Sequence, residues 1–192
     1  MGVGILGGAF DPPHDGHVAL ARAAVAHFGL DSLLVRVVEA PGHKGVDASA
    51  ADRLALATIA FAELPEAEVA LDPFARTVDS LEALGLDDPI LLVGADELAA
   101  FLDWKEPERV LELARLGVAT RPGYPQAVLD DVRARLAQPG RVVLFELEPY
   151  AISSSDIRAR VAGGRSLDGL VQQGVADEIQ RRGLYRRATG LH

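Results

Sequence analysis

The chain has 192 residues, and 49% of them are apolar, which is enough for one domain with a full hydrophobic core. It contains no cysteine, so disulfides, thiolate zinc sites and thiol nucleophiles are excluded. The formal net charge of -9 argues against a broad nucleic-acid surface, because phosphate backbones require clustered Lys and Arg side chains. A few cations gathered in one cleft remain compatible with this acidic balance.

The first residues lack the basic segment of a secretory signal, and no uncharged apolar stretch is long enough to span a bilayer. We therefore expect a soluble cytoplasmic protein with neither a membrane nor a nucleic-acid partner. Its oligomeric state stays open, a homo-oligomer included, because exposed apolar patches are visible only in coordinates.

Short apolar runs alternate with helical patterns along most of the chain. Runs typical of buried strands are 3–6, 32–38, 68–71, 90–93, 116–119 and 142–145. Apolar spacing predicts helices over 18–28, 50–64, 78–84, 107–114 and 125–136, with Thr77 as the N-cap of the third. This alternation predicts an α/β fold: a doubly wound, Rossmann-like parallel sheet with helices on both faces.

After residue 145 the pattern becomes helical, with helices predicted over 155–161, 167–171 and 175–182. We interpret the chain as a single domain, 1–192, with a short helical C-terminal extension from about residue 155. The polar tail 186–192 is expected to be frayed. Doubly wound sheets bind ligands at the carboxyl ends of their strands, so the residues that follow strands are the candidates for a site.

The glycines near the N-terminus need separate interpretation. Residues 2–7 spell the Gly-x-Gly-x-x-Gly dinucleotide fingerprint, but that motif needs a strand before its glycines and only Met1 precedes them. We reject the match. The informative glycines are Gly7 and Gly8, which follow the strand 3–6 and lead through a short loop to the first helix.

His14 and His17 flank Gly16 at this strand-to-helix turn. Loop amides and the helix dipole favour an anion there, and imidazoles can donate hydrogen bonds to phosphate oxygens and stabilise charge that develops during transfer. A single histidine at such a turn is more often a loop or cap residue without a chemical role. The pair favours a phosphate site.

Two segments carry a family resemblance. Residues 7–17, GGAFDPPHDGH, resemble the signature of the nucleotidylyltransferase superfamily with the His-x-Gly-His motif, and residues 152–158, ISSSDIR, resemble its second signature. Within that superfamily the chain is most similar to the bacterial nicotinate-mononucleotide adenylyltransferases, from about residue 4 to residue 185. Further matches in family order are 41–44, Arg53, 77–79, 94–96, Trp104, 121–124 and 182–185.

The resemblance implies transfer of AMP from ATP to nicotinate mononucleotide, which yields deamido-NAD and pyrophosphate. The nucleophile would be the acceptor's own phosphate, which is largely dianionic at neutral pH because its second pKa is about 6. Such a reaction needs positioning and charge stabilisation rather than a general base or a covalent intermediate. Mg²⁺ is expected to arrive on the ATP phosphates and to keep much of its water, with no metal ligands supplied by the protein.

The resemblance also implies residue roles. His14 and His17 would hold the ATP phosphates, with His17 nearest the α-phosphate, while Lys44 and Arg158 would neutralise the leaving pyrophosphate. Asp96 would bind ribose hydroxyls. The other implied nucleotide-binding residues are Gly7, Gly8, Ala9, Phe10, Gly94, Arg121, Ile152, Ser153 and Ser155.

The acceptor side departs most from the family pattern. Trp104 would stack on the nicotinate ring, beside Thr77 and Arg76, but Arg76 stands where the family generally has an aromatic residue. One hypothesis is that Arg76 pairs with the nicotinate carboxylate; the alternative is a solvated arginine. Ser155 replaces a usual threonine, Gly42 replaces a usual proline, and the preceding segment 36–40 differs from the family's usual one.

Each assignment has a plainer alternative. Lys44 is otherwise a solvated loop residue, Arg158 a surface ion-pair partner and Trp104 a core residue. The serine run 153–155 is otherwise only a helix cap. At the level of function, the alternatives are another phosphorylated acceptor (nicotinamide mononucleotide, phosphopantetheine or a cytidylyl acceptor) or a non-catalytic nucleotide-binding protein.

Overall fold

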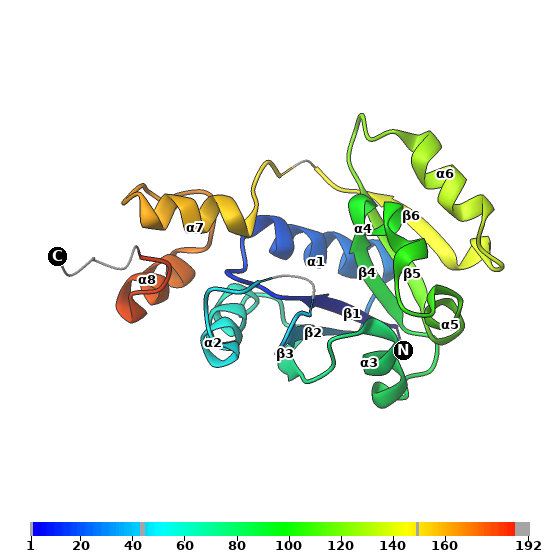
Figure 1. Cartoon of the computed structure of the whole chain (residues 1–192), viewed down its shortest axis with the longest axis horizontal. Helices are drawn as coiled ribbons and strands as arrows, with labels where there is room; N and C mark the ends of the chain where they lie inside the picture. Colours follow the sequence, from blue (N-terminus) through cyan, green and yellow to red (C-terminus); the bar gives the residue numbers. More distant parts are fainter. Residues whose placement is uncertain (1, 43–44, 149, 187–192) are drawn as a thin grey trace.

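The computed structural model describes residues 2–42, 45–148 and 150–186. Its centre is one six-stranded sheet in which all neighbouring strands are parallel, in the order β3-β2-β1-β4-β5-β6 (Figure 1). The strands are β1 Val3–Gly8, β2 Ser32–Val38, β3 Ala67–Asp72, β4 Ile90–Gly94, β5 Arg115–Thr120 and β6 Val142–Glu146. The predicted doubly wound sheet is confirmed, and each predicted strand lies within an observed one.

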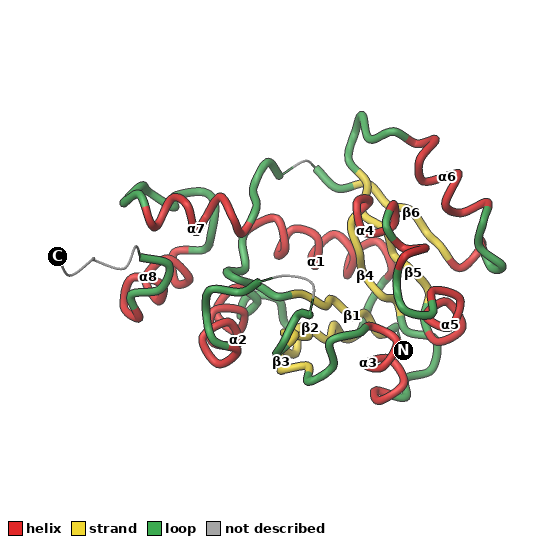
Figure 2. Tube along the Cα trace, in the orientation of Figure 1, coloured by secondary structure: helices red, strands yellow, loops and turns green. Residues whose placement is uncertain are grey.

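Helices cover both faces of the sheet (Figure 2). The α-helices are α1 Asp15–Phe28, α2 Ala50–Ala60, α3 Thr77–Leu84, α4 Ala95–Ala99, α5 Pro107–Leu113, α6 Gln126–Ala134, α7 Ser154–Ala162 and α8 Gln173–Arg182, and two short 3₁₀ helices are η1 Phe101–Asp103 and η2 Pro139–Arg141. Side chains of α1, α2, α7 and α8 share one core with the sheet, and those of α3, α4, α5 and α6 share the other.

The strand sequences explain this two-sided burial. In β1, Ile5 enters the core under α3 to α6, while Leu6 enters the core under α1 and α2. Successive side chains of a strand point to opposite faces, so a continuous apolar run is what a sheet covered on both sides requires. The connection order reverses between β1 and β4, which places the carboxyl ends of the central strands at the switch point.

Two predictions about local structure were wrong. Residues 167–171 form a turn rather than a helix: Gly169 has a left-handed φ of 69°, and the Leu170 carbonyl accepts the Asp15 amide at 3.0 Å instead of an intrahelical donor. Thr77 is the first residue of α3, and Arg76 occupies the N-cap with extended backbone angles.

The predicted helix 50–64 is also shorter than expected. It ends at Ala60, because the residue before Pro65 is disfavoured in the helical conformation and the last turn unwinds ahead of it. The C-terminal extension is present, and Figure 1 shows α7 and α8 together at one end of the molecule. The tail predicted to be frayed lies outside the described residues beyond Arg186. Within the described chain, no helix is both long and apolar enough to cross a membrane.

Candidate functional site

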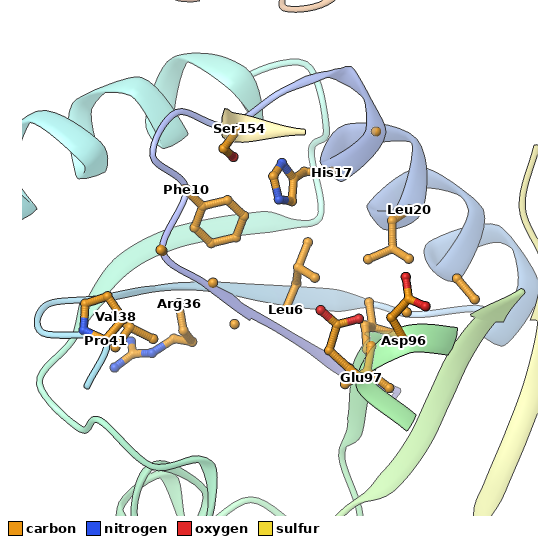
Figure 3. Close-up of a pocket in the computed structure, with 18 of the residues that line it drawn as sticks. Leu6, Phe10, His17, Leu20, Arg36, Val38, Pro41, Asp96, Glu97 and Ser154 are labelled. Carbon is orange, nitrogen blue, oxygen red and sulfur yellow. The ribbon is translucent and has the colours of Figure 1, made fainter. Parts of the chain in front are cut away.

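A cavity of about 880 Å³ lies at the carboxyl ends of the central strands (Figure 3). The labelled side chains around it come from β1 and the loop after it, from α1, from β2 and the loop after it, and from α4 and α7. Predicted site residues in its wall are Gly7, Gly8, Ala9, Phe10, His14, His17, Arg76, Thr77, Gly94, Asp96, Trp104, Arg121, Ser153, Ser155 and Arg158. Ile152 instead packs against the core under α1, and Lys44 lies outside the described residues.

The loop after β1 folds tightly over its own strand. Phe10 has a left-handed φ of 49° and a buried ring, and a Cβ on Gly8 would lie 3.1 Å from that ring. Gly7 has no neighbouring heavy atom within 4 Å of the position its Cβ would take. Because Gly7 lines the cavity, any side chain there would occupy space that a ligand needs.

The two imidazoles lie against each other, with ring centroids 3.8 Å apart. The His14 backbone amide donates to Nδ1 of His17 at 3.2 Å, so the neutral His17 ring carries its proton on Nε2. Burial lowers the pKa of His14 from 6.5 to about 4, against a smaller upward effect of Asp156. His14 is therefore neutral at pH 7, and its buried Nδ1 has no hydrogen-bond partner.

Helix α7 is tied directly to the first loop, although 142 residues separate Pro12 from Ser154. The Ser154 hydroxyl donates to the Pro12 carbonyl at 2.8 Å, and Nη1 of Arg158 donates to the Asp11 carbonyl at 2.8 Å. Ser153 caps α7 by accepting the Asp156 amide, so the capping interpretation holds for that serine. The motifs from both ends of the chain thus share one cavity wall.

Arg53 organises this region from beneath. Its side chain is fully buried and donates hydrogen bonds to the carbonyls of Ala9, Val38, Glu39 and Ala48, at 2.7 to 3.2 Å. One guanidinium therefore joins the first loop, the end of β2 and the segment that leads into α2. Sequence comparison marked Arg53 as a family match without a role, because backbone carbonyl partners leave no pattern in the sequence.

Asp11 is a second organising residue that sequence reasoning missed. Its carboxylate is 3% exposed and accepts the backbone amides of Asp47, at 2.7 Å, and Ala48, at 3.1 Å. The Tyr185 hydroxyl donates to the same carboxylate at 2.8 Å, which joins the C-terminal extension to the loop. Burial and this acceptor raise the pKa of Tyr185, so its hydroxyl stays protonated as a donor. Arg158 completes the cluster through an ion pair between its Nε and Oδ2 of Asp47 at 2.8 Å.

The opposite side of the cavity is acidic. Asp96 and Glu97 follow β4 in the first turn of α4, and a Cβ on Gly94 would lie 2.8 Å from Oε2 of Glu97. The Tyr124 hydroxyl donates to Oδ1 of Asp96 at 3.2 Å, and burial, assisted by Asp96, raises the pKa of Tyr124. Exposed carboxylate oxygens suit hydroxyl donors such as those of a ribose.

Trp104 is compatible with both interpretations that the sequence left open, a core residue and a residue of the ligand site. It packs against the core under α5, with its ring 5.2 Å from that of Phe101, and it also lines the cavity. An ion pair at 2.7 Å between Lys105 and Asp79 holds this segment beside the first turn of α3. The Trp104 ring thus forms part of the cavity wall near the N-terminus of α3.

Comparison with known proteins identifies the family. The cytidylyltransferase-like family model matches residues 5–160. A "Probable nicotinate-nucleotide adenylyltransferase" of Bordetella avium is 37% identical, covering 97% of this chain and 98% of the relative. A relative of the same name from Rubrobacter xylanophilus is 35% identical over 97% and 92%. This chain belongs to the cytidylyltransferase-like family, in its nicotinate-nucleotide adenylyltransferase branch.

Solved structures share the fold of this adenylyltransferase branch. The Plasmodium falciparum nicotinic acid mononucleotide adenylyltransferase complexed with NaAD superimposes with a TM-score of 0.75 at 16% identity, covering 96% of this chain and 97% of that one. The same protein complexed with APC superimposes with a TM-score of 0.72. Within the described residues of the present adenylyltransferase, no group of three or more His, Cys, Asp or Glu side chains is arranged to hold a metal ion.

Proposed function

We propose that this protein transfers AMP from ATP to nicotinate mononucleotide, a step of NAD biosynthesis that yields deamido-NAD and pyrophosphate. An oxygen of the acceptor phosphate forms the new bond to the α-phosphorus, and the bond from that phosphorus to the bridging oxygen of pyrophosphate breaks. The observation that carries the proposal is the single cavity shared by His14, His17 and Arg158 with Trp104 and the start of α3. Anion donors and an aromatic wall in one cavity suit a reaction between a triphosphate and a pyridine nucleotide.

His17 is proposed to act on the α-phosphate. Its Nδ1 accepts a backbone amide, which assigns the proton of the neutral ring to Nε2, and Nε2 is the proposed donor to an oxygen of the reacting phosphoryl group. A fixed donor of this kind stabilises negative charge that develops in the transition state. His14, neutral in the free protein, is proposed to donate to the adjacent phosphates.

Arg158 and Lys44 are proposed to neutralise the β- and γ-phosphates. Arg158 is half-buried, and its contacts with Asp11 and Asp47 hold the guanidinium at the cavity wall. Lys44 is not among the described residues, but Pro41 and Gly45 on either side of it line the cavity. Mg²⁺ enters with ATP as part of the substrate.

The remaining predicted residues divide between the two substrates. For the adenylyl donor, Asp96 is proposed to bind ribose hydroxyls and Arg121 to border the same side. For the acceptor, Trp104 is proposed to stack on the pyridine ring. Thr77 and Arg76, at the N-terminus of α3, are proposed to border the acceptor on the same side of the cavity. The other proposed nucleotide contacts are Gly7, Gly8, Ala9, Phe10, Gly94, Ser153 and Ser155; Ile152 supports this wall from the core.

A pyrophosphate-release assay tests the proposal. ATP and CTP are each paired with nicotinate mononucleotide, nicotinamide mononucleotide and phosphopantetheine, and the highest kcat/KM is expected for ATP with nicotinate mononucleotide. A higher value with CTP would assign another nucleotidyl donor, and a higher value with nicotinamide mononucleotide or phosphopantetheine would assign another acceptor. If ATP binds but no pair releases pyrophosphate, the protein binds nucleotides without catalysing this transfer.

A further inference from the structure

Arg36 is an arginine inside the sheet for which the described protein supplies no partner. It lies within β2, in register with Gly7 of β1 on one side and Ala70 of β3 on the other. Neither neighbour has a side chain longer than a methyl group, so the strand surface around Arg36 is open. Its sequence neighbours Val35 and Val37 enter the core under α1 and α2, which directs Arg36 to the opposite face, where it lines the cavity.

The guanidinium has no anion among the described residues. Its Nε is buried without a hydrogen-bond partner. The carboxylate two positions along the neighbouring strand, Asp72, is already engaged by the Ser80 hydroxyl at 2.6 Å and the Phe74 amide at 3.0 Å. A half-buried cation with a buried, unsatisfied donor is unfavourable unless an anion completes it. The guanidinium of Arg36 is therefore positioned to bind an anionic ligand in the cavity.

The surroundings of Arg36 place it on the acceptor side. Figure 3 shows it beside Val38 and Pro41, across the cavity from Asp96 and Glu97. The bond between Ser80 and Asp72 fixes α3 over the end of β3, on the same face of the sheet as Arg36. The Lys105–Asp79 ion pair brings the Trp104 segment to this same helix. The cavity wall on the side of α3 thus contains a guanidinium.

We infer that Arg36 binds the carboxylate on the acceptor's pyridine ring and sets the preference for the acid over the amide; this inference rests on the proposed function. A carboxylate offers a planar pair of oxygens that matches the guanidinium fork, whereas a carboxamide offers one acceptor oxygen and no charge. Arg76, the candidate from sequence, is exposed at the cavity mouth, where water and salt weaken an ion pair. Arg36 is better shielded and carries the selectivity.

The test compares Arg36→Met with Arg76→Ala in the full-length protein. Methionine keeps an unbranched side chain in the cavity wall and removes the charge. The ratio of kcat/KM for nicotinate mononucleotide over nicotinamide mononucleotide is expected to fall by about 10- to 100-fold in Arg36→Met. It is expected to stay within about 2-fold in Arg76→Ala. Arg36→Lys, which keeps the charge without the fork, is expected to retain an intermediate ratio and serves if the methionine variant does not fold.

A second readout measures binding without turnover. Trp104 is the single tryptophan, so its fluorescence reports each mononucleotide titrated without ATP. Loss of affinity for the acid alone supports the inference. Equal losses for acid and amide would overturn it and move Arg36 to the phosphate or ribose that both acceptors share. An unchanged ratio in Arg36→Met would also overturn it, whereas wild-type protein that releases no pyrophosphate with either acceptor would overturn the proposed function itself.

Discussion

The two ends of the cavity are built differently. The end proposed to bind the phosphates is crosslinked: Arg53 joins four backbone carbonyls, Asp11 accepts two amides and a tyrosine hydroxyl, and Arg158 ties α7 to the first loop. The acceptor end presents an aromatic wall and a guanidinium without a partner among the described residues. Rigid positioning suits a step that depends on orientation and charge stabilisation. A guanidinium that has no protein partner can instead discriminate between ligands by their charge.

This contrast predicts that substitutions at the phosphate end change stability or kcat, while those at the acceptor end change the choice of substrate. The Arg36 experiment tests the second half of the contrast. The first half is tested by four changes at the phosphate end.

The largest effect on folding is expected for Arg53→Met. Four carbonyls lose their donor and part of a buried site is left empty, so the free energy of unfolding should fall by about 3–5 kcal/mol. Urea denaturation measures the change. Arg22→Met is the matched control, because its ion pair with Glu63 is exposed and should contribute less than about 1 kcal/mol. Similar losses of unfolding free energy in both variants would show that the hydrogen bonds of Arg53 do not stabilise this region more than an exposed ion pair does.

His17→Ala should have the largest effect on catalysis. We expect kcat to fall by about 10²–10³-fold while the Kd for ATP changes much less, because the lost donor matters most in the transition state. Steady-state kinetics and ATP titration separate the two quantities. His27→Ala, at the far end of α1 and outside the cavity wall, should leave kcat near wild type. Equal losses in kcat and ATP affinity would make His17 an ordinary binding residue.

The buried His14 predicts a specific pH dependence of stability. Its folded pKa of about 4 lies below the unfolded value of 6.5, so the folded state binds fewer protons between these values. The contribution is fully present above pH 6.5 and is lost as the pH falls toward 4, by about 3 kcal/mol in total. Urea denaturation between pH 7 and pH 4 should show this loss in the wild type but not in His14→Asn. Parallel curves for the two proteins would contradict a buried neutral imidazole.

The smallest of these effects is expected for Tyr185→Phe. Asp11 keeps its two amide donors and loses one hydroxyl, so the free energy of unfolding should fall by about 1–2 kcal/mol. Thermal denaturation measures the shift. Tyr150→Phe, an exposed control, should leave the melting temperature nearly unchanged. A melting temperature in Tyr185→Phe as little changed as in Tyr150→Phe would show that the bond to Asp11 does not stabilise the extension against the loop.

The sequence alone determined the architecture and the place of the two histidines that are proposed to bind phosphate. Apolar runs that alternate with amphipathic helices predict a parallel sheet covered on both faces. Local spacing also predicts that His14 and His17 lie at a strand-to-helix turn. These features depend on residues close together in the chain, and periodicity records such features directly. The turn at 167–171 was mispredicted because its Leu170 carbonyl accepts the distant Asp15 amide, and the start of α3 was mispredicted by one residue at a cap without a side-chain hydrogen bond.

Only the tertiary structure decided which residues organise and complete the site. Arg53 acts on backbone carbonyls up to 44 residues away, and Asp11 meets Tyr185 across 174 residues. Backbone partners are the same at every position of a chain, so no residue pattern reveals them. Arg36 occupies a strand position that the sequence treats as ordinary, and its importance arises from a glycine, an alanine and a cavity that the fold brings beside it.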